Sequence, residues 1–156
     1  MLDVAIIGSG PAGVAAAINV RQRNRSLVLL GATEVSRKLE SAQEIANYPG
    51  FPEIGGAALG EAFHRHLDAL GIAVERKYVD HVYPMGDFYA LTSGEEMWEA
   101  RSVVLATGVT AFKPIEGEIE LLGRGVSYCA TCDGRLYKGR PVLALAYDED
   151  AEEEIR

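Results

Sequence analysis

The feature that most constrains the fold of this chain is a glycine-rich stretch, GSGPAG, at residues 8–13. A short apolar run, Val4 to Ile7, comes before it, and a run of small residues follows. In this context the pattern G-x-G-x-x-G predicts a strand, a tight turn and a helix, the beginning of a Rossmann-like α/β domain. The first glycine permits the turn, the second lets a pyrophosphate approach the backbone, and the third lets the helix lie close to the strand. The candidate dinucleotide-binding residues are therefore Gly8, Ser9, Gly10, Pro11, Ala12 and Gly13.

The next segment continues this pattern. A second apolar run, Leu27 to Leu30, predicts another strand. Glu34 lies 21 positions after Gly13, about where a carboxylate accepts hydrogen bonds from a ribose. Glu34 is therefore a further candidate for cofactor binding, although three residues separate it from the strand. The alternative is a glycine-rich turn in an α/β domain that binds no dinucleotide.

The middle of the chain predicts a helix followed by short strands. In residues 55–71 apolar side chains recur at intervals of three and four, which is typical of a helix with one buried face. From Ile72 to Val104 short extended runs alternate with turn residues. This alternation predicts a small antiparallel meander, with Tyr89 and Trp98 as its packing anchors.

The run SVVLATG, residues 102–108, predicts a buried parallel strand. Its end is expected at the carboxyl edge of the sheet, where α/β proteins bind ligands. Ala106, Thr107 and Gly108 are therefore further candidate cofactor-binding residues. A connection punctuated by proline and glycine follows, and we place a domain boundary near residues 113–117.

Composition places the chain among soluble globular proteins, because 48% of its 156 residues are hydrophobic and 24% are charged. Its longest apolar runs have the length of strands, far below the roughly 20 residues that a membrane span needs. Asp3 stands where a signal peptide carries positive charge, so we expect a cytoplasmic protein. The formal net charge of −8 disfavours nucleic acid as a partner.

Both cysteines of the chain lie in one C-x-x-C pattern, at Cys129 and Cys132, and Asp133 follows directly. In a reducing compartment such a pair is more often catalytic, redox-active or metal-binding than a permanent structural disulfide. A zinc site would need two more ligands, but the sequence has no second C-x-x-C and no H-x-x-x-H. His64 and His66 are two residues apart and point to different faces of the predicted helix. A redox dithiol is favoured over half of a zinc site.

Four separated motifs occur in order along the chain: GSGPAG, NYPGFPE (residues 47–53), LATG (105–108) and CATCDG (129–134). Together they resemble the low-molecular-weight thioredoxin reductases, a branch of the two-dinucleotide-domain flavoprotein disulfide reductases. The resemblance implies that residues 1–115 are the N-terminal part of an FAD-binding domain. Residues 116–156 would then hold a linker, the dithiol and the first strand of a second, incomplete domain of the pyridine-nucleotide type.

The resemblance also implies how the protein works and with which partners. Electrons would pass from FAD to the disulfide and then to thioredoxin or a similar disulfide protein, within a homodimer. Cys132 would face the flavin and form the charge-transfer contact, Cys129 would attack the partner's disulfide, and Asp133 would act as general acid and base. This division is chemically reasonable because a thiolate is the nucleophile and an adjacent carboxyl group can exchange protons with it.

Asn47 matches the asparagine that approaches the flavin ring in this family. The alternative is that Asn47 is an ordinary turn residue near a proline, because asparagine favours turns. A nearby segment departs from the family pattern. SRKL, residues 36–39, stands where the family has a glycine-glycine-glutamine run against the flavin.

A second departure concerns the electron donor. After a predicted strand at residues 142–147, the family has another glycine-rich loop for NADPH, but residues 146–151 read AYDEDA. Three carboxylates would lie where a pyrophosphate has to sit, and like charges about 4 Å apart repel by on the order of 1 kcal/mol in water. The subset of relatives that accept electrons from ferredoxin shares this loss, so we expect ferredoxin as the donor. An NADPH-dependent enzyme and a non-catalytic FAD-binding fragment are the alternatives.

Compared with the family pattern, the chain stops early in a predicted helix, at Arg156. The rest of the second domain and the segment that returns to the flavin domain would follow in the family. We therefore expect an N-terminal fragment that does not complete the catalytic cycle alone.

Overall fold

A computed structural model describes residues 1–31, 39, 42–108 and 115–146, apart from the side chains of Thr131 and Cys132. The chain divides into two compact units. The first unit is Met1–Glu40 with Ala57–Thr110, and the second is Ser41–Gly56 with Ala111–Arg156. Among the helices of these described ranges, none is long and apolar enough to cross a membrane.

The first unit is built on a six-stranded sheet with the strand order β3-β2-β1-β6-β5-β4. The first four strands in this order are parallel to one another, and β4, β5 and β6 form an antiparallel meander. The predicted α/β class, the βαβ unit and the meander are therefore confirmed. The strands are β1 Leu2–Ile7, β2 Leu27–Gly31, β3 Val74–Arg76, β4 His81–Pro84, β5 Tyr89–Ser93 and β6 Glu96–Leu105.

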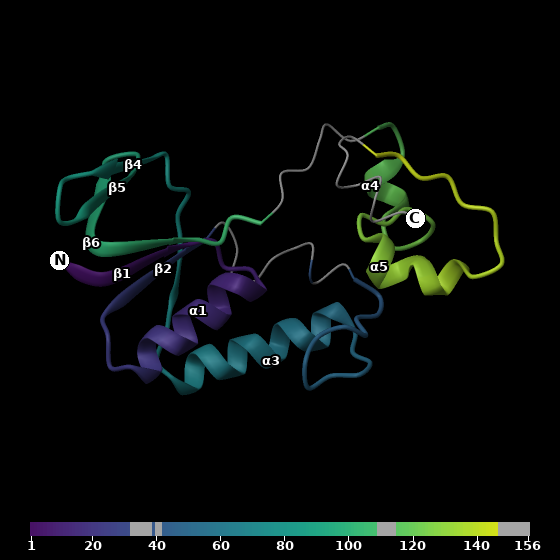
Figure 1. Cartoon of the computed structure of the whole chain (residues 1–156), viewed down its shortest axis with the longest axis horizontal. Coiled ribbons are helices and arrows are strands. Elements are labelled where there is room, and N and C mark those ends of the chain that lie inside the picture. Colours follow the sequence, from purple (N-terminus) through teal and green to yellow (C-terminus); the bar gives the residue numbers. More distant parts are fainter. Residues whose placement is uncertain (32–38, 40–41, 109–114, 147–156) are drawn as a thin grey trace. The chain divides into compact units, whose positions relative to one another are not determined.

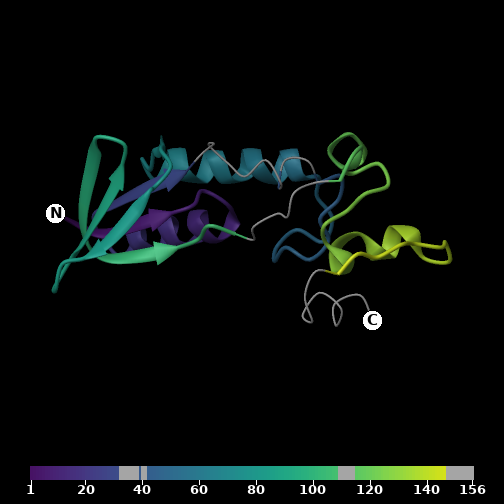
Figure 2. The ribbon, with the colours of Figure 1, turned by 90° about the horizontal axis from the view of Figure 1, so that it is seen from above.

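Two helices cover one face of the parallel strands. Helix α1, Pro11–Gln22, connects β1 to β2, and helix α3, Gly56–Ala69, precedes β3. Both helices lie on the same side of β1 and β2, while the β4–β5 hairpin lies on the other side (Figure 1). Figure 2 shows the first unit from above, with the hairpin turning back at one end of the sheet.

The core follows the alternation of side chains along the strands. Ala5, Val28 and Leu30 lie in one buried cluster with Leu91 of β5, so this face packs against the meander. Trp98 is partly buried against the same cluster and is a packing anchor as predicted. Tyr89 is 38% exposed, so its prediction as a second anchor is wrong.

The opposite face of the parallel strands is also buried. Ile6 follows Ala5 in β1, and Leu29 lies between Val28 and Leu30 in β2. Both side chains are fully buried. Helix α1, whose Val14 and Ala17 are buried, contacts both β1 and β2. Burial of one such aliphatic side chain contributes about 1.5–3 kcal/mol relative to exposure, so the two layers hold β1 and its turn firmly.

Strand β6 has two different partners along its length. Its residues 96–100 pair with β5, and residues 100–105 pair with β1. Beyond Ala100, no strand among the described residues pairs with the other edge of β6. The parallel pairing confirms the predicted strand, but its predicted burial is wrong at the end, because Val103 and Val104 are half-buried and Leu105 is 71% exposed.

The second unit consists mainly of loops and short helices. Ile45 and Ile54 form an antiparallel bridge that closes a loop. The Gln43 side-chain amide donates to the Gly123 carbonyl, and Glu44 pairs with Arg135, so this loop and the C-terminal residues are joined. The short helices are α4 Glu118–Leu121, α5 Ala130–Asp133 and the 3-10 helix Gly134–Tyr137.

Residues 142–146, where the sequence predicts a strand, have no regular secondary structure. Their apolar side chains are exposed, with Leu143 at 88%. A strand of this composition forms only when neighbouring strands take its backbone hydrogen bonds, and none of the described strands pairs with it.

The division into units also groups Ser41–Gly56 with the C-terminal residues. The domain boundary expected near residues 113–117 stays a prediction.

Candidate functional site

The glycine-rich turn lies where three parallel strands end. Gly8 follows β1 with φ +112°, a left-handed conformation that favours glycine. Its N–H donates to the Leu30 carbonyl of β2 at 2.7 Å, and the Ala106 N–H donates to the Ile7 carbonyl at 2.8 Å. The turn and the residues after β6 are therefore side by side at the carboxyl edge of the sheet.

Two of the three glycines are required by close backbone contacts. A Cβ added at Gly8 would lie 2.1 Å from the Ala106 carbonyl oxygen, and one at Gly13 would lie 1.8 Å from the Gly8 carbonyl oxygen. Any side chain at these positions would push the helix or β6 away from the turn. Gly10 has φ −74° and ψ −176°, which any residue can adopt. The backbone conformation at position 10 therefore does not require a glycine. The predicted close approach of a pyrophosphate to the backbone remains the explanation for Gly10.

The N-terminus of α1 has the features of an anion site. Pro11 occupies its first turn, no acidic residue lies in that turn, and the helix begins with the Val14 N–H donating to the Gly10 carbonyl at 2.9 Å. The first N–H groups of a helix lack intrahelical partners and carry the positive end of the dipole. The predicted residues 8–13 thus fit the diphosphate of a dinucleotide, because the turn offers backbone N–H groups and excludes competing carboxylates.

Three further predicted residues complete this edge of the sheet, and one was missed. Ala106, Thr107 and Gly108 follow β6 directly, and Gly108 has φ +72°. Gly31, at the end of β2, was not predicted as part of the site, but a Cβ there would lie 2.2 Å from Ser9 Oγ. The signal in the sequence was a glycine directly after an apolar strand. Glu34 lies outside the described residues, as do residues 36–38 of the SRKL segment.

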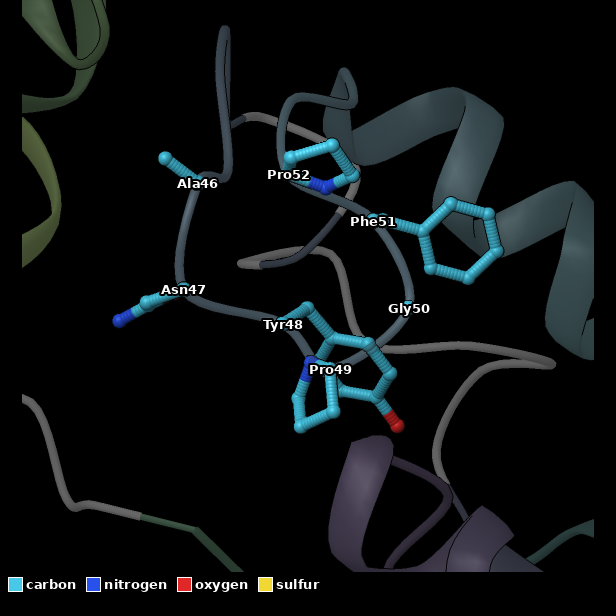
Figure 3. A pocket seen from close by; sticks show the side chains of 7 residues that line it. All are labelled: Ala46, Asn47, Tyr48, Pro49, Gly50, Phe51 and Pro52. Atoms are coloured by element: carbon cyan, nitrogen blue, oxygen red, sulfur yellow. The ribbon is translucent and has the colours of Figure 1, made fainter.

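The predicted flavin-facing loop belongs to the second unit. Between Ile45 and Ile54 the backbone exchanges hydrogen bonds of 2.7 and 3.0 Å, and the Phe51 N–H donates to the Tyr48 carbonyl at 3.0 Å, with Gly50 at φ +89°. Residues 46–52 line an open hollow of about 410 Å³. Asn47 is exposed, and its side chain points away from the rings of Tyr48 and Phe51 (Figure 3).

The predicted dithiol lies in the same unit as this loop. Cys129 is disulfide-bonded and half-buried, and it directly precedes helix α5. The only other cysteine of the chain is Cys132, within α5. The Asp133 N–H donates to the Cys129 carbonyl at 3.1 Å, which closes the single turn of α5 and brings the Asp133 backbone back to the first cysteine.

Hydrogen bonds also hold the residues that lead into the dithiol. The Tyr128 hydroxyl donates to Glu118 Oε1 at 2.6 Å, and the Ile115 N–H donates to Glu118 Oε2 at 2.6 Å. The Tyr128 hydroxyl is the main cause of a lowered pKa of Glu118, and the Ile115 N–H adds to it. Sequence patterns did not indicate this contact, because it joins residues ten positions apart across a loop.

The predicted site residues therefore fall into two sets. The residues of the glycine-rich turn and of the β6 end come together in the first unit, and Asn47, Cys129 and Asp133 belong to the second unit. The first set can hold a dinucleotide. The second set combines a disulfide-bonded cysteine with a carboxyl group and an open loop.

Comparison with known proteins identifies the family of this chain. Residues 2–147 match the family model described as pyridine nucleotide-disulphide oxidoreductase. The chain is 33% identical over 153 residues to the thioredoxin reductase of Bacillus subtilis (strain 168), covering 97% of this chain and 48% of that protein. It thus spans about half the length of the curated relatives that it matches.

Solved structures give the same result at the level of the fold. A ferredoxin-flavin thioredoxin reductase from Clostridium acetobutylicum is 48% identical with a TM-score of 0.69, over 98% of this chain and 53% of that one. Thioredoxin reductase from Streptococcus pyogenes MGAS5005 is 32% identical with a TM-score of 0.80, over 88% of this chain and 45% of that one. The chain belongs to the pyridine nucleotide-disulphide oxidoreductase family, and these relatives within it are thioredoxin reductases.

Proposed function

We propose that the protein containing this chain is a flavin-dependent thiol-disulfide oxidoreductase that reduces thioredoxin or a similar disulfide protein. The observation that supports this most directly is the disulfide-bonded Cys129 beside Asp133, in a chain that also contains a dinucleotide-binding turn. The thioredoxin reductases among its relatives support the same substrate class. We place the protein in the cytoplasm, as a homodimer.

FAD is the cofactor in this proposal. The family match and the flavin named for the Clostridium acetobutylicum relative support it. The diphosphate would lie against the turn of residues 8–13, with Thr107 and Gly108 beside it. A bound flavin would supply the electron pair that reduces the disulfide, and side chains of this chain would carry out the remaining steps.

The dithiol would reduce the partner in two exchanges. The Cys129 thiolate attacks one sulfur of the partner's disulfide, forms a mixed disulfide and releases the other sulfur as a thiolate, which takes up a proton. Cys132 then attacks the Cys129 sulfur, so that the second partner sulfur leaves and the Cys129–Cys132 disulfide is restored. The partner gains two electrons and two protons, and Asp133 is the group placed to exchange protons with these thiolates.

We propose ferredoxin as the electron donor. Three carboxylates at residues 148–150, which lie outside the described residues, stand where the loop for NADPH is expected. The similarity to a ferredoxin-flavin thioredoxin reductase supports the same donor. NADPH is the second candidate, because the matching family is described by pyridine nucleotides.

Anaerobic rapid mixing distinguishes the two donors. The full-length protein is loaded with FAD and mixed with either reduced ferredoxin or NADPH, and the loss of flavin absorbance is followed. We expect bleaching by ferredoxin and none by micromolar NADPH. Rapid bleaching by NADPH would instead assign the protein to the nicotinamide-dependent enzymes.

A further inference from the structure

The Ser127 hydroxyl lies between the first cysteine and the carboxylate of the dithiol segment. The Cys129 N–H donates to Ser127 Oγ at 3.1 Å. Ser127 Oγ in turn donates to Asp133 Oδ2 at 2.5 Å. One hydroxyl group thus connects the residue that begins the C-x-x-C pattern with the acid that follows it.

The direction of this chain of hydrogen bonds is set by the single hydroxyl proton. Ser127 Oγ also lies 3.3 Å from the Cys129 carbonyl oxygen, but the carboxylate oxygen is 0.8 Å nearer. A charged acceptor at this short distance makes the stronger bond. The hydroxyl proton therefore goes to Asp133, and the Cys129 N–H bonded to the Ser127 oxygen reinforces that donation.

We infer that Ser127 is a positioning residue for Asp133 in the reaction of the dithiol, an inference that rests on the proposed function. The bond fixes one carboxylate oxygen of Asp133 on the same hydroxyl group that accepts the Cys129 N–H. Asp133 can then take the proton of the attacking Cys129 thiol and pass it to the thiolate that leaves the partner. Without the hydroxyl, the half-buried Asp133 carboxylate loses the hydrogen bond that fixes its orientation.

If Ser127 had only a structural role, its removal would have a different effect on the reaction rates. A serine that only satisfies the Cys129 N–H would affect stability when removed, but not the dependence of the rate on the leaving group. An alkyl disulfide releases a strongly basic thiolate that needs a proton, whereas an aromatic disulfide releases a weakly basic one that does not. The ratio of the two rates therefore reports proton delivery separately from folding and thiolate formation.

The experiment uses the full-length protein with its dithiol reduced chemically, so that neither flavin reduction nor thioredoxin is needed. Rates with hydroxyethyl disulfide and with an aromatic disulfide are measured across the neutral pH range. For Ser127→Val we expect the alkyl rate to fall about tenfold, within the usual contribution of acid-base catalysis. The aromatic rate should change less than about twofold.

Three comparisons complete the test. Ser127→Thr keeps the hydroxyl on a side chain of the same shape as valine and should restore the alkyl rate. In an Asp133→Asn background Ser127→Val should have no further effect, because the two groups act as one unit. Ser102→Ala, at an exposed serine of β6, should leave both rates unchanged.

Equal effects on both disulfides, or full additivity with Asp133→Asn, would overturn the inference. A protein that fails to reduce thioredoxin but shows the expected rate ratios would refute the proposed function and leave the role of Ser127 standing. Unfolding of Ser127→Val would be visible by circular dichroism, and Ser127→Ala, which removes the same hydroxyl with a smaller side chain, then takes its place.

Discussion

At the scale of single residues, the absence of a side chain decides the geometry of the glycine-rich turn at residues 8–13. Gly8 and Gly13 each lie so close to a backbone carbonyl that a methyl group would overlap it. Both contacts are made by backbone atoms, which cannot move aside as the end of a flexible side chain can. The same positions are the ones for which the motif itself demands glycine.

Replacement of Gly13 tests this geometry. Gly13→Ala should displace the start of α1, lower the stability by about 1–3 kcal/mol and abolish FAD binding. Urea unfolding and quenching of flavin fluorescence measure the two effects. Gly134→Ala is the matched control, because nothing lies within 4 Å of the added methyl group and the backbone needs no positive φ. If Gly13→Ala binds FAD normally, the turn does not hold the diphosphate.

The contact between Tyr128 and Glu118 predicts a dependence of stability on pH. The pKa of Glu118 is held below its ordinary value of 4.5, chiefly by the Tyr128 hydroxyl. A carboxyl group with a lowered pKa in the folded state stabilises it above the unfolded-state pKa, and this contribution is lost as the pH falls through the folded-state value.

Tyr128→Phe should therefore destabilise the chain at neutral pH and have a smaller effect in acid, where Glu118 is protonated in both states. Urea denaturation of the variant and the parent, at a series of pH values from neutral to below 4.5, follows this difference. An effect that is the same at every pH would show that the Tyr128 hydroxyl does not act through the ionised carboxylate.

At the scale of elements, the parts of the fold with regular local signals were predictable. The strand-turn-helix at the N-terminus, the amphipathic α3 and the meander each have a clear period or turn residues in the sequence. The exposure of Leu105 was not predictable, because it depends on which segments cover the faces of the sheet at the end of β6 and not on the sequence of β6 itself.

For the candidate site too, only residues within short sequence motifs could be predicted. The turn of residues 8–13 and the C-x-x-C pattern could be proposed as candidates because short sequence motifs define them. Gly31 and Ser127 were missed as functional candidates, because their contacts with Ser9 and Asp133 appear only after the chain has folded. Residues 142–146 have the composition of a strand, but composition does not provide hydrogen-bonding neighbours.

The packing of the meander on the parallel strands can be tested at Leu91. This side chain of β5 is fully buried in the cluster that includes Ala5 and Leu30. Leu91→Ala should cost about 2–5 kcal/mol, from lost burial and the cavity left behind. Met97→Ala, in the neighbouring strand but 62% exposed, should stay within about 0.5 kcal/mol. Urea denaturation compares the two, and equal effects would contradict the assigned core.

At the scale of the whole molecule, the predicted site residues are distributed over the two compact units. The first unit contains the turn that fits a dinucleotide, and the second contains the disulfide-bonded Cys129 with Asp133. The loop of residues 46–52 belongs to the second unit, to which Gln43 and Glu44 attach it through Gly123 and Arg135. The predicted flavin-facing loop and the predicted dithiol thus share one unit.

The ion pair between Glu44 and Arg135 contributes little to this attachment. The Arg135 side chain is 54% exposed and the Glu44 side chain 28% exposed, and exposed pairs contribute about 0–1 kcal/mol. Glu44→Gln should therefore change the free energy of unfolding by less than about 1 kcal/mol. A larger loss in urea denaturation would show that the pair holds the loop in place.

The central claim is that electrons pass from the flavin to the dithiol and then to a protein disulfide. Its most direct test is an anaerobic reductive titration of the FAD-loaded full-length protein and its Cys132→Ser variant, followed by addition of oxidised thioredoxin. The account predicts that both proteins bind FAD, that the parent takes up one more electron pair than the variant, and that only the parent reduces thioredoxin. Equal electron uptake by the two proteins, or thioredoxin reduction by Cys132→Ser, would contradict it.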